Sequence, residues 1–220
     1  MEERHIEVEP GQPVSLSVHG VGDTALVLGH GAGGTRRMPV LLRLADALSA
    51  TGRRVLLFNF PYSEARRRMP DKAPLLEATV AACVRLARED LGAKRVVAGG
   101  KSMGGRMASQ AAANGLSVDG LVFLGYPLHP PGRFEKLRDA HLPKITAPML
   151  FIQGTRDDFA RWDLLEATLA KLGDRATLLK IDDGDHSFKV RKKLTGKSAA
   201  DVEALILRSI LAWLPGAARV

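Results

Sequence analysis

Residues 96–107 read VVAGGKSMGGRM. The segment begins as an apolar run, passes through glycines to Ser102 and continues into an alanine-rich pattern typical of a helix. A serine in a G-x-S-x-G sequence between a strand and a helix is typical of a nucleophile elbow, a sharp turn that exposes the hydroxyl. The turn strains the backbone of the serine, and small residues such as Gly100 and Gly104 leave room for it. The segment therefore predicts a strand, a turn that carries a nucleophile, and a helix.

The tripeptide Gly100-Lys101-Ser102 also matches the end of a phosphate-binding loop, G-x-x-x-x-G-K-S. That pattern requires its first glycine at position 95, which is Arg95 in this chain. The strand pattern also continues almost to Gly99, so too few residues remain to wrap a phosphate. The nucleophile elbow is the better interpretation.

Strand-like and helix-like patterns alternate along the rest of the chain. Short apolar runs predict buried parallel strands, and longer amphipathic patterns predict helices. The expected strands span 24–28, 55–60, 96–98, 121–124, 149–152 and 176–181, and the expected helices 39–50, 75–91, 103–113, 162–172 and 199–214. Residues 6–9 and 14–18 flank a Pro-Gly-Gln-Pro turn and predict an antiparallel hairpin. The pattern indicates an α/β fold with a mostly parallel twisted sheet, an N-terminal hairpin and helices on both faces.

The length of the chain sets its expected domain organisation. A chain of 220 residues is within the range of a single α/β domain, so one domain over residues 1–220 is predicted. About twenty residues separate the expected strands 121–124 and 149–152, which is enough for a loop and a short helix. We therefore expect no cap domain.

Composition and charge exclude several classes of protein. The net charge is +8, but the arginines are scattered without interleaved aromatic residues or a DNA-binding helix signature, so no nucleic-acid partner is predicted. No apolar run is long enough to cross a membrane, and the charged N-terminus lacks the apolar region of a signal peptide. The single cysteine, Cys83, lies among alanines and valines and fits a reducing compartment. These features predict a cytoplasmic protein without a membrane partner.

Three residues in the order serine, acid, histidine follow three expected strands. A serine hydroxyl needs an imidazole to take its proton and a carboxylate to orient that imidazole. Asp157 follows the strand at 149–152, and His186 follows the strand at 176–181. Since the carboxyl ends of parallel strands meet at one edge of the sheet, Ser102, Asp157 and His186 are the predicted catalytic residues.

Other acids near these positions allow alternative interpretations. Asp158 competes with Asp157 for the role of the acid, and it could instead cap the helix at 162–172. Asp182, Asp183 and Asp185 resemble metal ligands, but no matching ligand cluster accompanies them. We therefore predict neither a metal nor a cofactor.

An oxyanion intermediate needs two backbone N–H donors, one of them from the residue after the nucleophile. Met103 holds that position. The second donor comes from the loop after an early strand, where the segment His30-Gly31-Ala32-Gly33-Gly34 places Ala32. His30 is expected to brace this loop.

The segment after the strand at 121–124 reads GYPLHPPG, residues 125–132. It predicts a substrate-binding wall formed by Tyr126, Leu128 and His129 together with Pro127, or else a rigid proline-rich connection. Phe60 and Tyr62 are further candidates for this wall. Lys101 and Arg106 could attract an acidic substrate, or be surface and helix-end charges.

Several of these segments together resemble the α/β-hydrolase family. They are similar to small capless bacterial serine hydrolases near the dienelactone hydrolases, a group that includes relatives in chromatin-associated complexes. The segments that carry the resemblance are LGHGAGG at 28–34, GGKSMGGR at 99–106, GYPLHPPG at 125–132, QGTRD at 153–157 and GDHSF at 184–188. The resemblance implies a triad of Ser102, Asp157 and His186. Dienelactone hydrolases have cysteine where this chain has Ser102, so a dienelactone substrate is not implied.

The sequence thus predicts a serine hydrolase that cleaves a small ester or thioester through an acyl-enzyme. A peptidase of the same fold is one alternative. A non-catalytic scaffold or interaction protein with a hydrolase fold is another. The oligomeric state and the acyl group are left open.

Overall fold

The computed structural model describes residues 1–214 and contains one eight-stranded sheet. The strand order is β1-β2-β4-β3-β5-β6-β7-β8, and all neighbouring strands from β4 to β8 are parallel. The antiparallel hairpin β1–β2 pairs with β4 and forms one edge. The strands are Glu2–Glu7 (β1), Pro13–His19 (β2), Thr24–Gly29 (β3), Arg54–Phe58 (β4), Arg95–Lys101 (β5), Gly120–Leu124 (β6), Met149–Gly154 (β7) and Ala176–Ile181 (β8). The predicted fold class and hairpin are confirmed.

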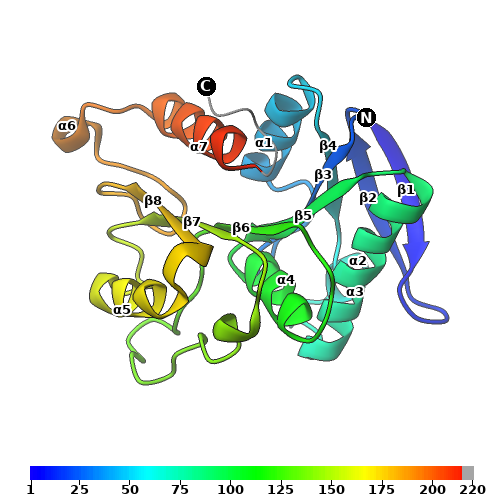
Figure 1. Cartoon of the computed structure of the whole chain (residues 1–220), viewed down its shortest axis with the longest axis horizontal. Helices are drawn as coiled ribbons and strands as arrows, with labels where there is room; N and C mark the ends of the chain where they lie inside the picture. Colours follow the sequence, from blue (N-terminus) through cyan, green and yellow to red (C-terminus); the bar gives the residue numbers. More distant parts are fainter. Residues whose placement is uncertain (215–220) are drawn as a thin grey trace.

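Helices cover both faces of this sheet (Figure 1). The first and last long helices, α1 and α7, lie side by side on one face, and α3, α4 and α5 lie on the other. The helices are Pro39–Ser49 (α1), Pro61–Glu64 (α2), Ala73–Arg85 (α3), Met103–Ala113 (α4), Trp162–Leu172 (α5), Lys192–Thr195 (α6) and Ala199–Trp213 (α7). Among the described residues the connection from β6 to β7 holds only a one-turn helix, Leu142–Lys144, so the fold has no cap domain.

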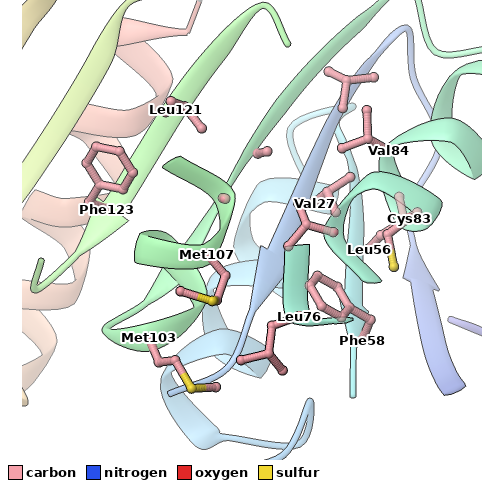
Figure 2. Close-up of a cluster of buried hydrophobic side chains, with 14 of the residues drawn as sticks. Val27, Leu56, Phe58, Leu76, Cys83, Val84, Met103, Met107, Leu121 and Phe123 are labelled. Atoms are coloured by element: carbon pink, nitrogen blue, oxygen red, sulfur yellow. The ribbon is translucent and has the colours of Figure 1, made fainter. Parts of the chain in front are cut away.

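Alternating side chains of the buried strands supply two hydrophobic clusters, one on each face of the sheet. In β5, Val96 and Ala98 face α3 and α4, while Val97 faces α1 and α7. Figure 2 shows part of the first cluster, in which Met103 and Met107 of α4 lie among residues of α3 and the sheet. Each fully buried aliphatic or aromatic side chain stabilises the fold by about 1.5–3 kcal/mol. This packing fixes the start of α4, and with it the position of Ser102.

Several predicted boundaries differ from the structure. The expected strand 55–60 ends at Phe58, because the N–H of Phe60 donates to the His30 ring instead of to a neighbouring strand. The expected helix 75–91 is α3 followed by a π-helical turn at Leu86–Asp90. The one-turn helices α2 and α6 were not predicted. In the part of the chain that the structure describes, no helix is long and apolar enough to cross a membrane.

Candidate active site

Ser102 occupies a strained turn between β5 and α4. Its backbone has φ 50° and ψ −113°, a region that costs a residue with a side chain about 1–3 kcal/mol. Its N–H donates to the carbonyl of Leu124 at 3.1 Å, which ties the turn to β6. A Cβ atom on Gly104 would lie 2.2 Å from the carbonyl oxygen of Gly29, so only glycine lets α4 approach β3 this closely. The elbow predicted from the sequence is present.

A continuous chain of hydrogen bonds joins the three predicted residues. Nε2 of His186 lies 3.0 Å from Oγ of Ser102, and Nδ1 lies 2.7 Å from Oδ2 of Asp157. Asp157 is 4 % exposed, whereas the His186 side chain is 24 % exposed and reaches the cavity. A carboxylate can only accept, so Nδ1 carries the proton toward Asp157 and Nε2 is free to accept the Ser102 proton. The arrangement suits a nucleophile, its base and an orienting acid.

Asp157 is held by two further donors. Its Oδ1 accepts from the N–H of Phe159 at 2.8 Å, and its Oδ2 accepts from Nε2 of Gln153 at 2.6 Å. Gln153 is fully buried, and its Oε1 accepts from the N–H of Tyr126 at 2.8 Å. The role of Gln153 was not predicted, although a polar residue at the end of the apolar strand β7 was a usable signal. The competing Asp158 is exposed and lies outside this network.

His30, Phe60 and Tyr62 hold the loop after β3 in place. His30 is fully buried, and burial lowers its pKa, which keeps the ring neutral. Its Nε2 accepts from the N–H of Phe60 at 3.2 Å, so Nδ1 carries the proton and donates to the carbonyl of Gly31 at 2.8 Å. The hydroxyl of Tyr62 accepts from the N–H of Gly33 at 3.1 Å. His30 therefore holds the loop, as expected.

The predicted oxyanion donors are both free to bind. Ala32 and Met103 line the same cavity as Ser102, and their N–H groups donate to no residue between 1 and 214. The Met103 N–H belongs to the first turn of α4, where helical N–H groups have no partner within the helix. The positive end of the helix dipole adds to their attraction for a negative oxygen.

These groups open into a cavity of about 470 Å³, a size that suits a small organic molecule. Its lining includes apolar side chains from α3, α4 and the loops, and it also carries charged residues. Besides Ser102 and His186, the residues that line the cavity are Gly31, Ala32, Met38, Pro70, Asp71, Ala73, Leu76, Lys101, Met103, Arg106, Met107, Pro127, Arg138, Phe159 and Ser187.

Tyr126, Leu128 and His129 do not line this cavity, which corrects the substrate-binding wall expected from the sequence. Tyr126 and Leu128 are buried in the hydrophobic cluster beneath it, 1 % and 0 % exposed. His129 is fully buried, and its Nε2 accepts from the N–H of Arg161. The chain turns after β6 so that, of these four positions, only Pro127 faces the cavity. Phe60 and Tyr62 are buried as well, and support the loop at 30–34 instead.

Lys101, the residue before the nucleophile, carries a buried amine beside His186. Its Nζ has no hydrogen-bond partner among the described residues and lies 5.5 Å from the centre of the Phe188 ring. A Cβ on Gly125 would lie 2.9 Å from this Nζ and 3.4 Å from Nδ1 of His186, so the two nitrogens are neighbours. Burial lowers the pKa of Lys101 to about 8, against the opposing negative charges of Asp157 and Asp185. Lys101 is thus a buried amine at the cavity and not a surface charge.

We expect Lys101→Met to stabilise the protein at pH 7 by up to about 3 kcal/mol, since it removes a buried charge whose Nζ has no hydrogen-bond partner among the described residues. In the wild type, the folded pKa near 8 lies below the ordinary value of 10.5. The destabilisation caused by the buried ammonium group is complete below about pH 8. It disappears as the pH rises toward 10.5, because the amine is then neutral in both the folded and the unfolded protein. Urea unfolding at several pH values measures the difference. The exposed control Lys193→Met should show no such trend, and an unchanged or lower stability of Lys101→Met at pH 7 would contradict this account.

A mostly parallel sheet with a serine elbow after β5, an acid after β7 and a histidine after β8 defines the class of α/β-hydrolase folds. The sequence model of the alpha/beta hydrolase domain family matches residues 22–214. The chain therefore belongs to the alpha/beta hydrolase domain family.

Solved structures with the same fold include several serine hydrolases. A lidless α/β serine hydrolase from Xanthomonas campestris is 21 % identical, with a TM-score of 0.75 over 97 % of this chain and 96 % of that one. A serine hydrolase homologue from Coxiella burnetii is 18 % identical, with a TM-score of 0.75 over 95 % of this chain and 97 % of that one. Dienelactone hydrolase from Anabaena variabilis is 23 % identical, with a TM-score of 0.69 over 96 % and 97 % of the two chains. At these identities the likeness establishes the fold.

Proposed function

We propose that this protein is a serine hydrolase that cleaves small esters or thioesters through an acyl-enzyme on Ser102. The observation that carries the proposal is the hydrogen-bonded chain from Oγ of Ser102 through His186 to the buried Asp157, open to a cavity of small-molecule size. The family and the esterase-like neighbours agree with hydrolysis. The predicted relationship to chromatin-complex proteins stays a prediction, and the dienelactone hydrolase neighbour shows the shared fold alone. The proposal rests on neither.

In the first half of the reaction, Nε2 of His186 takes the proton from Oγ of Ser102 as Oγ attacks the carbonyl carbon. The carbonyl oxygen becomes negative and is stabilised by the N–H groups of Met103 and Ala32. Loss of one such donor typically costs about 3–4 kcal/mol of transition-state stabilisation. The bond to the leaving group then breaks, and His186 gives its proton to the departing alcohol or thiol.

In the second half, water attacks the acyl carbon and His186 takes the proton of that water. The bond between Oγ of Ser102 and the acyl carbon breaks, the carboxylic acid leaves, and His186 returns the proton to Ser102. Asp157 stays ionised and stabilises the imidazolium that forms in both halves. The residues thus complete the cycle without a cofactor.

The test is hydrolysis of p-nitrophenyl acetate and butyrate and of matching thioesters by the wild type and Ser102→Ala. We expect turnover by the wild type and loss of turnover in the variant. Turnover of peptide substrates alone would favour the peptidase of the same fold. No turnover of any of these substrates would favour a non-catalytic scaffold.

A further inference from the structure

Two arginines line the cavity of Ser102, and in the described part of the chain neither is paired with a carboxylate. Arg106 stands one turn into α4, where its N–H donates to the carbonyl of Ser102 at 3.1 Å, and Arg138 comes from the loop between β6 and β7. Among residues 1–214, neither forms an ion pair with an aspartate or glutamate. Their side chains reach neutral oxygens only at long range, Oε1 of Gln110 at 3.5 Å and the carbonyl of Pro127 at 3.4 Å. Most of their donors are therefore available to a ligand.

The two guanidinium groups are close enough to repel each other. Burial and then the charge of Arg138 lower the pKa of Arg106. The attraction of Glu77 is weaker, and that carboxylate accepts from Asn114. The neighbouring His141 is neutral at pH 7, because burial and the charge of Arg106 lower its pKa to about 4. The attraction of Glu77 offsets this repulsion only in part, and a bound anion would offset it further.

The backbone of Arg138 is held in place by two of the residues that do not line the cavity. Its N–H donates to the carbonyl of Leu128 at 2.8 Å, and its carbonyl accepts from the buried hydroxyl of Tyr126 at 2.7 Å. The backbone of Arg106 is also held, because the hydroxyl of Ser109 donates to its carbonyl at 2.7 Å. A site whose backbone is fixed in this way loses less conformational freedom when it binds a ligand.

The other charges at the cavity leave it positive. Asp71 is the one aspartate or glutamate among the described lining residues, and its Oδ1 already accepts from Arg67 at 2.6 Å. Its Oδ2 has no hydrogen-bond partner within residues 1–214. Lys101 adds a positive charge, although its Nζ is buried beside His186. The charge of the cavity therefore favours an anionic substrate over a neutral or cationic one.

We propose that Arg106 and Arg138 form a carboxylate-binding subsite, so that the preferred substrates are small esters or thioesters with a second, free carboxylate. This inference rests on the proposed role of Ser102. A guanidinium group binds a carboxylate through two parallel hydrogen bonds, a geometry that lysine cannot reproduce. The backbone of Arg106 lies one helical turn, about 5.4 Å along the axis, from that of the nucleophile, and both residues line the same cavity. The carboxylate should therefore lie only a few bonds from the scissile carbonyl, in either the acyl or the alcohol part.

The first arm of the experiment measures binding without turnover. Monoethyl glutarate and monoethyl adipate are titrated calorimetrically into Ser102→Ala, against ethyl esters in which an isopropyl group replaces the carboxylate. We expect the carboxylated esters to bind at least ~10-fold more tightly. Adding Arg106→Gln or Arg138→Gln to Ser102→Ala should remove most of this preference, and Arg106→Lys or Arg138→Lys should retain part of it. The exposed Arg133→Gln, on the same loop as Arg138, is the matched control and should leave the preference unchanged.

The second arm measures kcat/KM of the wild type for the same pairs and for acetate esters of small hydroxy acids, which carry the carboxylate in the alcohol part. A preference for the carboxylated member of either set supports the subsite. Equal kcat/KM and equal binding within every pair, or a preference that survives both Gln variants, would overturn it. If Ser102→Ala binds the half-esters selectively but the wild type hydrolyses nothing, the subsite stands and the proposed function fails. If the wild type hydrolyses both members of each pair equally and binding is also equal, the proposed function stands and the subsite fails.

Discussion

His186→Ala is expected to lower kcat/KM for a short p-nitrophenyl ester by about 10⁴-fold or more, since among residues 1–214 only the His186 ring is hydrogen-bonded to Oγ of Ser102. The distances that support this expectation are 3.0 Å from Nε2 to Oγ of Ser102 and 2.7 Å from Nδ1 to Asp157. Asp157→Asn should show a loss of similar order, because an amide can donate to Nδ1 and would then stabilise the wrong ring tautomer.

The control for both variants is Asp158→Asn, which changes the exposed neighbour of Asp157 and should leave kcat/KM near the wild-type value. Circular dichroism and the Tm of each variant verify that the fold is intact. Loss of activity in Asp158→Asn with activity retained in Asp157→Asn would show that the acid has been assigned to the wrong residue.

Gly104→Ala is expected to destabilise the protein by about 2–4 kcal/mol, although alanine is the better helix former. In an open helix this change would stabilise by about 1 kcal/mol. Here the added Cβ would lie 2.2 Å from the carbonyl oxygen of Gly29 and 2.9 Å from its Cα, and both are backbone atoms that cannot rotate away. Relief requires α4 to move away from β3, which also displaces Ser102.

The matched control is Gly92→Ala, where nothing lies within 4 Å of the added Cβ and only the positive φ of 66° opposes the change. Its expected cost is about 1–2 kcal/mol. Urea unfolding curves give both values. A Gly104→Ala variant as stable as the wild type would show that α4 and β3 are not in close contact.

The order of strands and helices was predictable because a parallel sheet buried on both faces leaves continuous apolar runs in the sequence. The ends of those runs were less certain. Phe60 extends the apolar pattern of β4, but its N–H donates to the His30 ring, and the residue lies beyond the end of the strand. Such a contact joins residues thirty positions apart, so local hydrophobicity cannot predict it.

The three residues of the hydrogen-bonded chain were predictable because each follows a strand whose carboxyl end reaches the same edge. Tyr126 also follows such a strand, yet its side chain turns into the core. The turn at 125–129 determines that direction, and residue types alone do not reveal it. Arg138 was missed because a cavity-lining arginine and an exposed one look the same within a charged loop.

The proposed function requires Ser102 to act as a nucleophile that forms a covalent intermediate. Intact-protein mass spectrometry after reaction with a fluorophosphonate tests it most directly, followed by proteolysis to locate the modified residue. We predict one adduct per chain, located on Ser102, and no adduct on Ser102→Ala. An adduct on another residue, equal labelling of Ser102→Ala, or an unlabelled wild type would contradict the claim.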